Sequence, residues 1–152
     1  MRRMRDGYDD GSMPYDLERF LVAQAGVYDG VLEELRRGRK SGHWIWFIFP
    51  QIAGLGYSPV SQHFAIASLD EARAYLAEPV LGARLRECAG VVLAIRGRTA
   101  GEIFGSTDAL KLRSSMTLFH RAGPDEAVFA QVLERYYGGI ADEATDARLG
   151  DG

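Results

Sequence analysis

Two short segments carry most of the side chains that could perform chemistry, and the first runs from Ser106 to Ser115. If this segment is helical, residues three, four and seven apart share a face, so Asp108, Lys111 and Ser115 form one polar stripe. Near a helix N-terminus, free N–H groups and the helix dipole favour a bound phosphate or carboxylate. The stripe therefore predicts an anion site; the alternative is a solvated face with an Asp–Lys pair.

The second segment, Lys40 to Gln51, reads KSGHWIWFIFPQ. Its tryptophans, Trp44 and Trp46, can present ring faces to a base or a nicotinamide. Lys40 and His43 can reach phosphates or transfer protons. We predict Lys40, the two tryptophans and Gln51 as ligand-binding residues, together with Ser115 of the first segment. The alternative is that the aromatic run is part of a buried core.

Lysine is rare in this chain, and its positions add weight to both segments. Of 18 basic side chains only Lys40 and Lys111 are lysines. A bias toward arginine codons explains the general excess of arginine but not these two positions. A lysine amine is compact and titratable, whereas a guanidinium is planar and always charged. Both lysines therefore lie in the segments where such an amine could be needed.

Other possible sites carry weaker signals. Cys88 is the only cysteine, which excludes an intramolecular disulfide and a thiolate metal cluster. The three histidines are scattered without metal-ligand spacing, so we predict no metal and no cofactor. The loop from Gly54 to Pro59 lacks the full spacing of a phosphate-binding glycine motif. Cys88 lies at helical spacing from Leu85 and Val92, which predicts a core position.

Length and composition limit the class of protein. The chain has 152 residues, 47% of them apolar, which is typical of one globular domain. A net charge of -3 and a pI near 5.6 provide no broad basic surface for duplex nucleic acid, so a phosphate-bearing partner should be small. The absence of a secretory signal, of a long apolar segment and of paired cysteines predicts a cytoplasmic protein without a membrane span. The oligomeric state stays open.

These residues must be positioned by helices. Residues 1–13 are polar and aperiodic, which predicts a disordered leader, and residues 14–150 are predicted to form a single globular domain. Apolar spacing predicts a helix over residues 16–37, with Asp16 as N-cap and Gly38 as the stop. Residues 43–49 are either a short buried strand or a buried helical turn.

Capping signals predict the later helices. Capping boxes are expected at Ser68–Glu71 and Thr99–Glu102, and Pro79 should be the first residue of a helix. Gly105 should end a short helix, and one of residues 106–108 should cap the next. Gly123-Pro124 should start the last long helix. The predicted fold class is mainly α, with an α+β alternative if 43–49 is a strand.

Three phrases resemble a known bacterial family: GRKSGHWIWFIFPQIAGLGYS, LDEARAYLAEPVLGARLREC and EIFGSTDALKLRSSMTLF. The family is of unknown function (domain of unknown function 1810) and often carries the label calpastatin. The resemblance covers about residues 16–149. Calpastatin itself is an intrinsically disordered protease inhibitor, whereas this composition is that of a folded domain.

The order of parts is also similar to that of the YbiA-like NADAR proteins, which are associated with ADP-ribose and related N-glycosidic substrates. The Glu-His pair typical of that group appears here as Gln62-His63. This second resemblance implies hydrolysis of a C1–nitrogen bond of a ribose phosphate or ADP-ribose. Lys111 would attack the opened sugar at C1 as a Schiff-base nucleophile, with Asp108 or His43 moving protons.

Three functions are compatible with these residues. The first is an enzyme or binder for an NAD-derived or nucleotide ligand. The second is a protein-interaction module, such as a stress or toxin–antitoxin partner, and the third is a metabolite sensor without catalysis. A pocket lined jointly by a tryptophan and Lys111 would favour a ligand site, whereas a contiguous exposed apolar patch would favour an interaction module.

Overall fold

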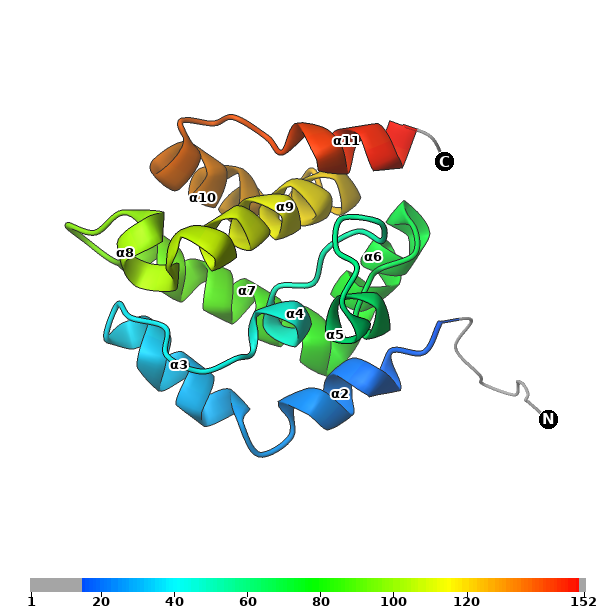
Figure 1. Cartoon of the computed structure of the whole chain (residues 1–152), viewed down its shortest axis with the longest axis horizontal. Coiled ribbons are helices and arrows are strands. Elements are labelled where there is room, and N and C mark those ends of the chain that lie inside the picture. The colour runs from blue at the N-terminus through cyan, green and yellow to red at the C-terminus, as the bar shows by residue number, and fades with distance from the viewer. Residues whose placement is uncertain (1–14, 151–152) are drawn as a thin grey trace.

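Helix α9, Ser106–Ala122, lies in the middle of the fold and carries the predicted polar stripe. In the computed structural model, which describes residues 15–150, it packs most extensively against four other helices (Figure 1). These are α6 (Leu69–Ala77), α8 (Ala100–Phe104), α10 (Ala127–Tyr137) and α11 (Glu143–Gly150). The long helix α7 (Pro79–Ala94) packs against α6, α10 and α3 (Tyr28–Arg36). The predicted mainly helical, single compact domain is confirmed.

The core is built from the apolar side of α9 and the helices around it. Leu112, Met116 and Phe119 are fully buried, as their helical spacing predicts. The Phe119 ring lies between Tyr75 of α6 and Phe129 of α10, with centroid distances of 5.4 and 6.0 Å. Burying a side chain of this size contributes about 1.5–3 kcal/mol. This packing holds α9 rigidly, so its opposite side can support a site.

Several predicted helix starts are confirmed. The Ser68 side chain accepts a hydrogen bond from the Glu71 backbone N–H, and α6 follows. Thr99 and Glu102 form the reciprocal capping box that opens α8. Pro79 is the first residue of α7, and the Glu78 carboxylate accepts two backbone N–H groups of its first turn. Local side-chain chemistry thus specifies these boundaries without help from the rest of the fold.

The prediction of one helix over residues 16–37 was wrong. The structure has two helices, α2 (Glu18–Gln24) and α3, separated by a turn at Gly26. Gly26 has a φ of 78°, a left-handed conformation that glycine adopts without strain. Leu17 precedes α2 as the N-cap residue, and Asp16 makes no side-chain cap. The helical spacing of apolar residues persists across the turn because both helices pack against α7.

The aromatic segment forms a helical turn and not a strand. Helix α4 is a single turn, Ile45–Ile48, so the α+β alternative was wrong. Within residues 15–150 the only β pairing is an isolated parallel bridge between Ile52 and Ile66. Ile45, Ile48 and Phe49 are all buried, and one helical turn buries such a run as well as a strand would.

Three further boundaries differ from the predictions. None of residues 106–108 caps α9; the N-cap is Gly105, whose φ is 82°. Helix α10 begins at Ala127 and not at Gly123-Pro124, and Gly138 is its C-cap, in a left-handed conformation. Helix α11 was not predicted, because its short sequence EATDARLG has little apolar periodicity.

Three further expectations concern the N-terminal residues, membrane spans and metal ligands. The predicted leader, residues 1–13, lies outside the described residues. In residues 15–150, no helix is long and apolar enough to span a bilayer. The same residues contain no cluster of His, Cys, Asp and Glu suited to hold a metal ion.

Cys88 gives a first testable prediction. Its side chain is fully buried in α7, and burial raises the pKa of the thiol to about 12. Replacing it by alanine should cost about 1 kcal/mol of unfolding free energy, measured by urea denaturation, because a small cavity forms. A thiol reagent should label native Cys88 only as fast as the protein unfolds. Labelling at the rate of a free thiol would contradict this core position.

Candidate functional site

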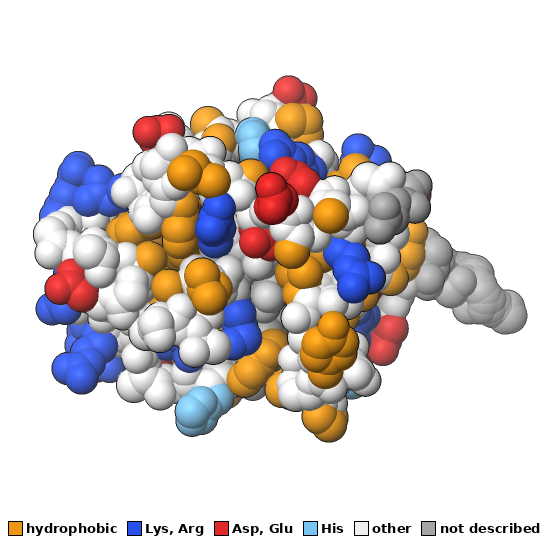
Figure 2. Space-filling model, turned by 45° about the horizontal axis from the view of Figure 1, so that its top comes forward, with side chains coloured by type: hydrophobic (Ala, Val, Ile, Leu, Met, Phe, Trp, Pro, Cys, Tyr) orange, Lys and Arg blue, Asp and Glu red, His pale blue; other side chains and the backbone are white. Residues whose placement is uncertain are grey.

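A pocket of about 450 Å³ lies between α4, the loop that follows it, α5 (Pro59–His63), α9 and the start of α11. It brings together segments that are far apart in the sequence. Figure 2 shows hydrophobic, basic and acidic side chains side by side near the middle of one face, and basic side chains gathered along its left edge. The residues that line the pocket are Trp46, Gln51–Gly56, Ser61, Gln62, Phe64, Ala65, Thr107, Leu110, Lys111, Ser114, Asp142 and Ala144.

The loop of residues 51–56 forms one wall and is held at both ends. Ile66 donates a backbone hydrogen bond to Gln51, and Ala53 donates one to Ile66, both of 2.8 Å. On the far side Arg148 of α11 donates to the Gly54 carbonyl at 3.2 Å. Gly54 has a φ of 97°, and a Cβ there would lie 2.5 Å from the Arg148 guanidinium carbon. The positive φ favours glycine at this position, which explains the loop better than a phosphate-binding motif does.

Helix α9 forms the opposite wall, but with a different set of residues from the predicted stripe. Thr107, Leu110, Lys111 and Ser114 face the pocket, at the spacing of one helical face. Ser115, the predicted ligand contact, is fully buried and does not line the pocket. Neighbouring residues differ by about 100° around a helix axis, so Ser114 faces the pocket while Ser115 faces the core.

Lys111 and Asp108 do lie together, and Lys40 joins them from the loop after α3. The Asp108 carboxylate receives Lys40 Nζ at 2.7 Å on one oxygen and Lys111 Nζ at 3.2 Å on the other. Burial acts to raise the pKa of Asp108, but the hydrogen bonds and charges of the two lysines outweigh it and lower that pKa. One carboxylate therefore bridges two ammonium groups, and only Lys111 also faces the pocket.

Lys40 and Trp44 occupy structural positions outside the pocket. The Lys40 side chain is only 6% exposed, and its ammonium lies 5.0 Å from the centre of the Trp44 ring. Trp44 is itself buried, and its indole N–H donates to Glu34 at 2.9 Å. The Glu34 carboxylate also accepts the backbone N–H groups of Ser41 and Gly42. This group fixes the loop against α3, so neither residue is placed to touch a ligand.

Trp46, Gln51 and His43 have different positions. Trp46 and Gln51 line the pocket, whereas His43 is exposed and does not. Lys111 Nζ lies 5.7 Å from the centre of the Trp46 ring, so the two residues form adjacent parts of the wall. The Trp46 indole N–H is buried and donates to no residue of the described chain. The pocket therefore combines an ammonium, an aromatic ring and an amide.

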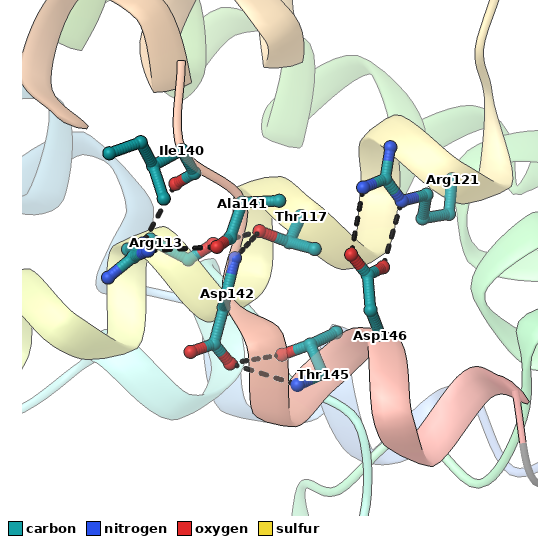
Figure 3. Close-up of polar contacts among 8 residues, drawn as sticks. All are labelled: Arg113, Thr117, Arg121, Ile140, Ala141, Asp142, Thr145 and Asp146. Carbon is teal, nitrogen blue, oxygen red and sulfur yellow. Dashed lines mark hydrogen bonds and ion pairs between the residues drawn. The ribbon is translucent and has the colours of Figure 1, made fainter. Parts of the chain in front are cut away.

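Asp142 is a charged pocket residue that the sequence analysis did not single out. It precedes α11, and its Oδ2 accepts hydrogen bonds from Thr145 N–H, Thr145 Oγ1 and Ser114 Oγ. Figure 3 shows the contacts that hold the backbone here: Arg113 donates to the Ile140 and Ala141 carbonyls. The Asp142 backbone N–H donates to Thr117 Oγ1. The Asp-x-x-Thr pattern at a helix start was the available signal. It points to a cap but not to a pocket.

Helix α11 is held to α9 by a bidentate ion pair. Arg121 donates to both carboxylate oxygens of Asp146, each at 2.9 Å (Figure 3). The Arg121 hydrogen bond is the main cause of the lowered pKa of Asp146, and burial opposes it. Thr145, one residue earlier, is fully buried. Polar contacts thus orient a short helix whose first residues complete the pocket.

The sequence of nearly the whole domain matches one family. Residues 14–149 match the model described as Protein of unknown function (DUF1810). The chain belongs to this family. This agrees with the resemblance of the three quoted phrases, and the DUF1810 description assigns no activity. The comparisons support neither the calpastatin label nor the NADAR resemblance.

A solved structure is similar to this DUF1810 domain over most of both chains. It is the crystal structure of the conserved hypothetical protein Rv1873 from Mycobacterium tuberculosis, with 54% sequence identity and a TM-score of 0.90. The match covers 91% of this chain and 99% of that one. No curated protein matches the domain. The fold is therefore shared, and the function has to be argued from the pocket itself.

Proposed function

We propose that this domain binds a small anionic, nucleotide-like ligand in the pocket between α4, α9 and α11. One observation supports this most: a single pocket of about 450 Å³ is lined by Trp46, Gln51 and Lys111, which come from distant segments. Pockets of about 300–1,000 Å³ with apolar walls and a few polar groups are typical of small-molecule sites. An ammonium beside an aromatic ring suits a ligand with both an anionic group and a planar ring.

Lys111 acts in this proposal as an anchor for the anionic group. Its side chain is 24% exposed, so the ammonium is accessible from the pocket while it donates to Asp108. Lys40 donates to the other oxygen of that carboxylate, so Asp108 neutralises only one of the two ammonium charges. The remaining positive charge favours an incoming phosphate or carboxylate.

The NADAR resemblance implies hydrolysis of an N-glycosidic bond, which requires a nucleophile and a base in addition to a residue that binds the phosphate. A Schiff base needs Lys111 as a neutral amine, and a base must remove its proton. Asp108 is a weak base because its pKa is lowered. Gln62 stands where a carboxylate would be needed, and its amide donates to the Tyr57 carbonyl. The geometry therefore favours binding over covalent catalysis.

The interaction-module reading has no comparable observation in its favour. Among the described residues, the large hydrophobic side chains that are exposed lie on several separate elements, with Val22 on α2, Val80 on α7 and Leu110 on α9. Scattered exposed hydrophobic residues are ordinary on a monomer surface.

Tryptophan fluorescence tests the proposal directly. Adding adenosine monophosphate, ADP-ribose or NAD should change the emission saturably at millimolar or lower concentration, because a ligand beside Lys111 displaces the ammonium that faces the Trp46 ring. Trp46→Phe should remove most of this change. Trp44→Phe is the matched control and should preserve it, since Trp44 is buried outside the pocket.

The absence of any saturable response to all three compounds in the wild-type protein would refute a nucleotide site. A response that survives Trp46→Phe and disappears with Trp44→Phe would place the ligand elsewhere. Isothermal titration calorimetry on the same proteins gives the affinity without relying on fluorescence.

A further inference from the structure

We infer that Asp142 is a specificity-determining residue of this pocket, and that it selects a ligand carrying a hydroxyl donor, namely the ribose diol of a ribonucleotide. The inference rests on the proposed function and goes beyond it, since it names the part of the ligand that each end of the pocket recognises. It depends on how the Asp142 carboxylate is held and on its place relative to Lys111.

The carboxylate of Asp142 is fixed by neutral donors on one side only. Oδ2 accepts the Thr145 backbone N–H at 3.1 Å and the Ser114 hydroxyl at 3.0 Å, as well as the Thr145 hydroxyl. Oδ1 makes no hydrogen bond to any residue in the range 15–150. Figure 3 shows this second oxygen turned away from Thr145. A pocket-lining carboxylate with one committed oxygen leaves the other as an acceptor for a ligand.

The backbone around Asp142 is held just as firmly. Its N–H donates to Thr117 Oγ1 at 2.8 Å. The two carbonyls before it accept the Arg113 guanidinium at 2.9 and 2.8 Å. All these partners lie on α9, the rigid central helix. A binding group held in place in this way loses little entropy when it forms a further hydrogen bond.

Among residues 15–150, no lysine or arginine forms an ion pair with Asp142. Lys111 pairs with Asp108, and Arg121 pairs with Asp146. The pocket therefore has a cationic end at Lys111 and an anionic end at Asp142. A phosphate is attracted to the first and repelled by the second, which orients an anionic ligand. The group that meets Asp142 must be a hydrogen-bond donor.

Lys111 and the α9 residue that contacts Asp142 lie on successive turns of the same helical face. Ser114, which donates to Asp142, follows Lys111 by three residues on the same face of α9. Three residues of an α-helix rise about 4.5 Å along its axis. A ribose 5′-phosphate carries its phosphate and its 2′,3′-hydroxyls at opposite ends of the sugar, so one ligand can present an anion to Lys111 and a hydrogen-bond donor to Asp142. A carboxylate that accepts from a ribose hydroxyl is an established way of reading nucleotides.

The test compares adenosine monophosphate with its 2′,3′-dideoxy analogue by calorimetry. The wild-type protein should bind the ribonucleotide about tenfold more tightly, as expected for a hydrogen bond to a charged acceptor. Asp142→Asn should remove most of this preference, because the loss of phosphate repulsion affects both nucleotides equally, whereas the loss of the charged acceptor weakens only the ribonucleotide. Asparagine keeps one carbonyl oxygen for the helix cap, so the fold should persist.

Glu143→Gln is the matched control, because it removes the same charge from the adjacent residue, which is exposed and does not line the pocket. It should preserve the preference for the ribonucleotide. If wild type binds both nucleotides equally, or Asp142→Asn keeps the preference, Asp142 does not read the diol, while the proposed function stands. If wild type binds neither nucleotide nor ADP-ribose, the proposed function fails and this inference fails with it. The wild-type comparison decides the matter even if Asp142→Asn does not fold.

Discussion

Lys111→Ala is expected to weaken the binding of adenosine monophosphate about tenfold or more while leaving the protein folded. The substitution removes the only ammonium that lines the pocket within the described residues, and a hydrogen bond to a charged group contributes about 1.5–3 kcal/mol. Lys111→Arg should also weaken binding, since a guanidinium is larger, planar and directed differently. Calorimetry gives the affinity, and the melting temperature shows whether the fold is intact.

Arg37→Ala provides the matched control for the loss of a cation. Arg37 forms an intrahelical ion pair with Glu33, far from the pocket, and both side chains are mostly exposed. Its removal should leave both affinity and stability almost unchanged. If the Lys111 variants bind adenosine monophosphate as tightly as Arg37→Ala does, Lys111 is part of a solvated helix face and not an anchor. Borohydride trapping of a sugar adduct at Lys111 would instead assign it the nucleophilic role.

Asp108→Asn is expected to destabilise the fold by about 3 kcal/mol, the largest loss of stability predicted for a single change near the pocket. Asp108 is 19% exposed and Lys40 is 6% exposed, so neutralising the carboxylate leaves the buried ammonium of Lys40 without its counter-charge. Breaking one side of a buried ion pair costs more than the pair itself contributes. Urea denaturation measures the change in unfolding free energy.

A double variant separates the lost ion pair from other effects. Lys40→Met together with Asp108→Asn should recover much of the lost stability, because no buried charge remains. Asp70→Asn is the control on an exposed pair with Arg73 and should change stability by no more than about 0.5 kcal/mol. Equal effects of Asp108→Asn and Asp70→Asn would mean that the Lys40–Asp108 pair is not stabilising.

The same pair sets a pH dependence with a definite sign. The folded-state pKa of Asp108 lies below its ordinary value of 3.8, so its stabilising contribution is complete above the unfolded pKa. That contribution is lost as the pH falls from about 4 through the lowered folded pKa. The stability difference between wild type and Asp108→Asn should therefore be constant near neutral pH and shrink in acid.

Local sequence determined a large part of the secondary structure. The starts of α6 and α8 follow from Ser68 and Thr99, whose hydroxyls accept a free backbone N–H of the first turn. The start of α7 follows from Pro79, which has no backbone N–H to satisfy. The burial of Cys88 and of the apolar side of α9 follows from helical spacing. These features depend on residues within one or two turns, which a sequence shows directly.

The break at Gly26 and helix α11 could not be predicted in the same way. The helical spacing of apolar residues continues across Gly26 because α2 and α3 both pack against α7. The turn is therefore visible only in the backbone conformation. Helix α11 has little apolar periodicity and is held by polar contacts such as Arg121–Asp146. Contacts between residues distant in sequence leave no periodic trace in either partner.

The sequence by itself singled out Trp46, Gln51 and Lys111 through residue type, and the tertiary structure decided that they meet in one pocket. It also decided the roles that residue type cannot distinguish. Lys40 and Lys111 are both lysines beside aromatic residues, yet Asp108 and the loop after α3 bury Lys40, while the turn of α9 directs Lys111 to the pocket. Burial is a property of the whole packed chain, and the one-residue difference between Ser114 and Ser115 is enough to change it.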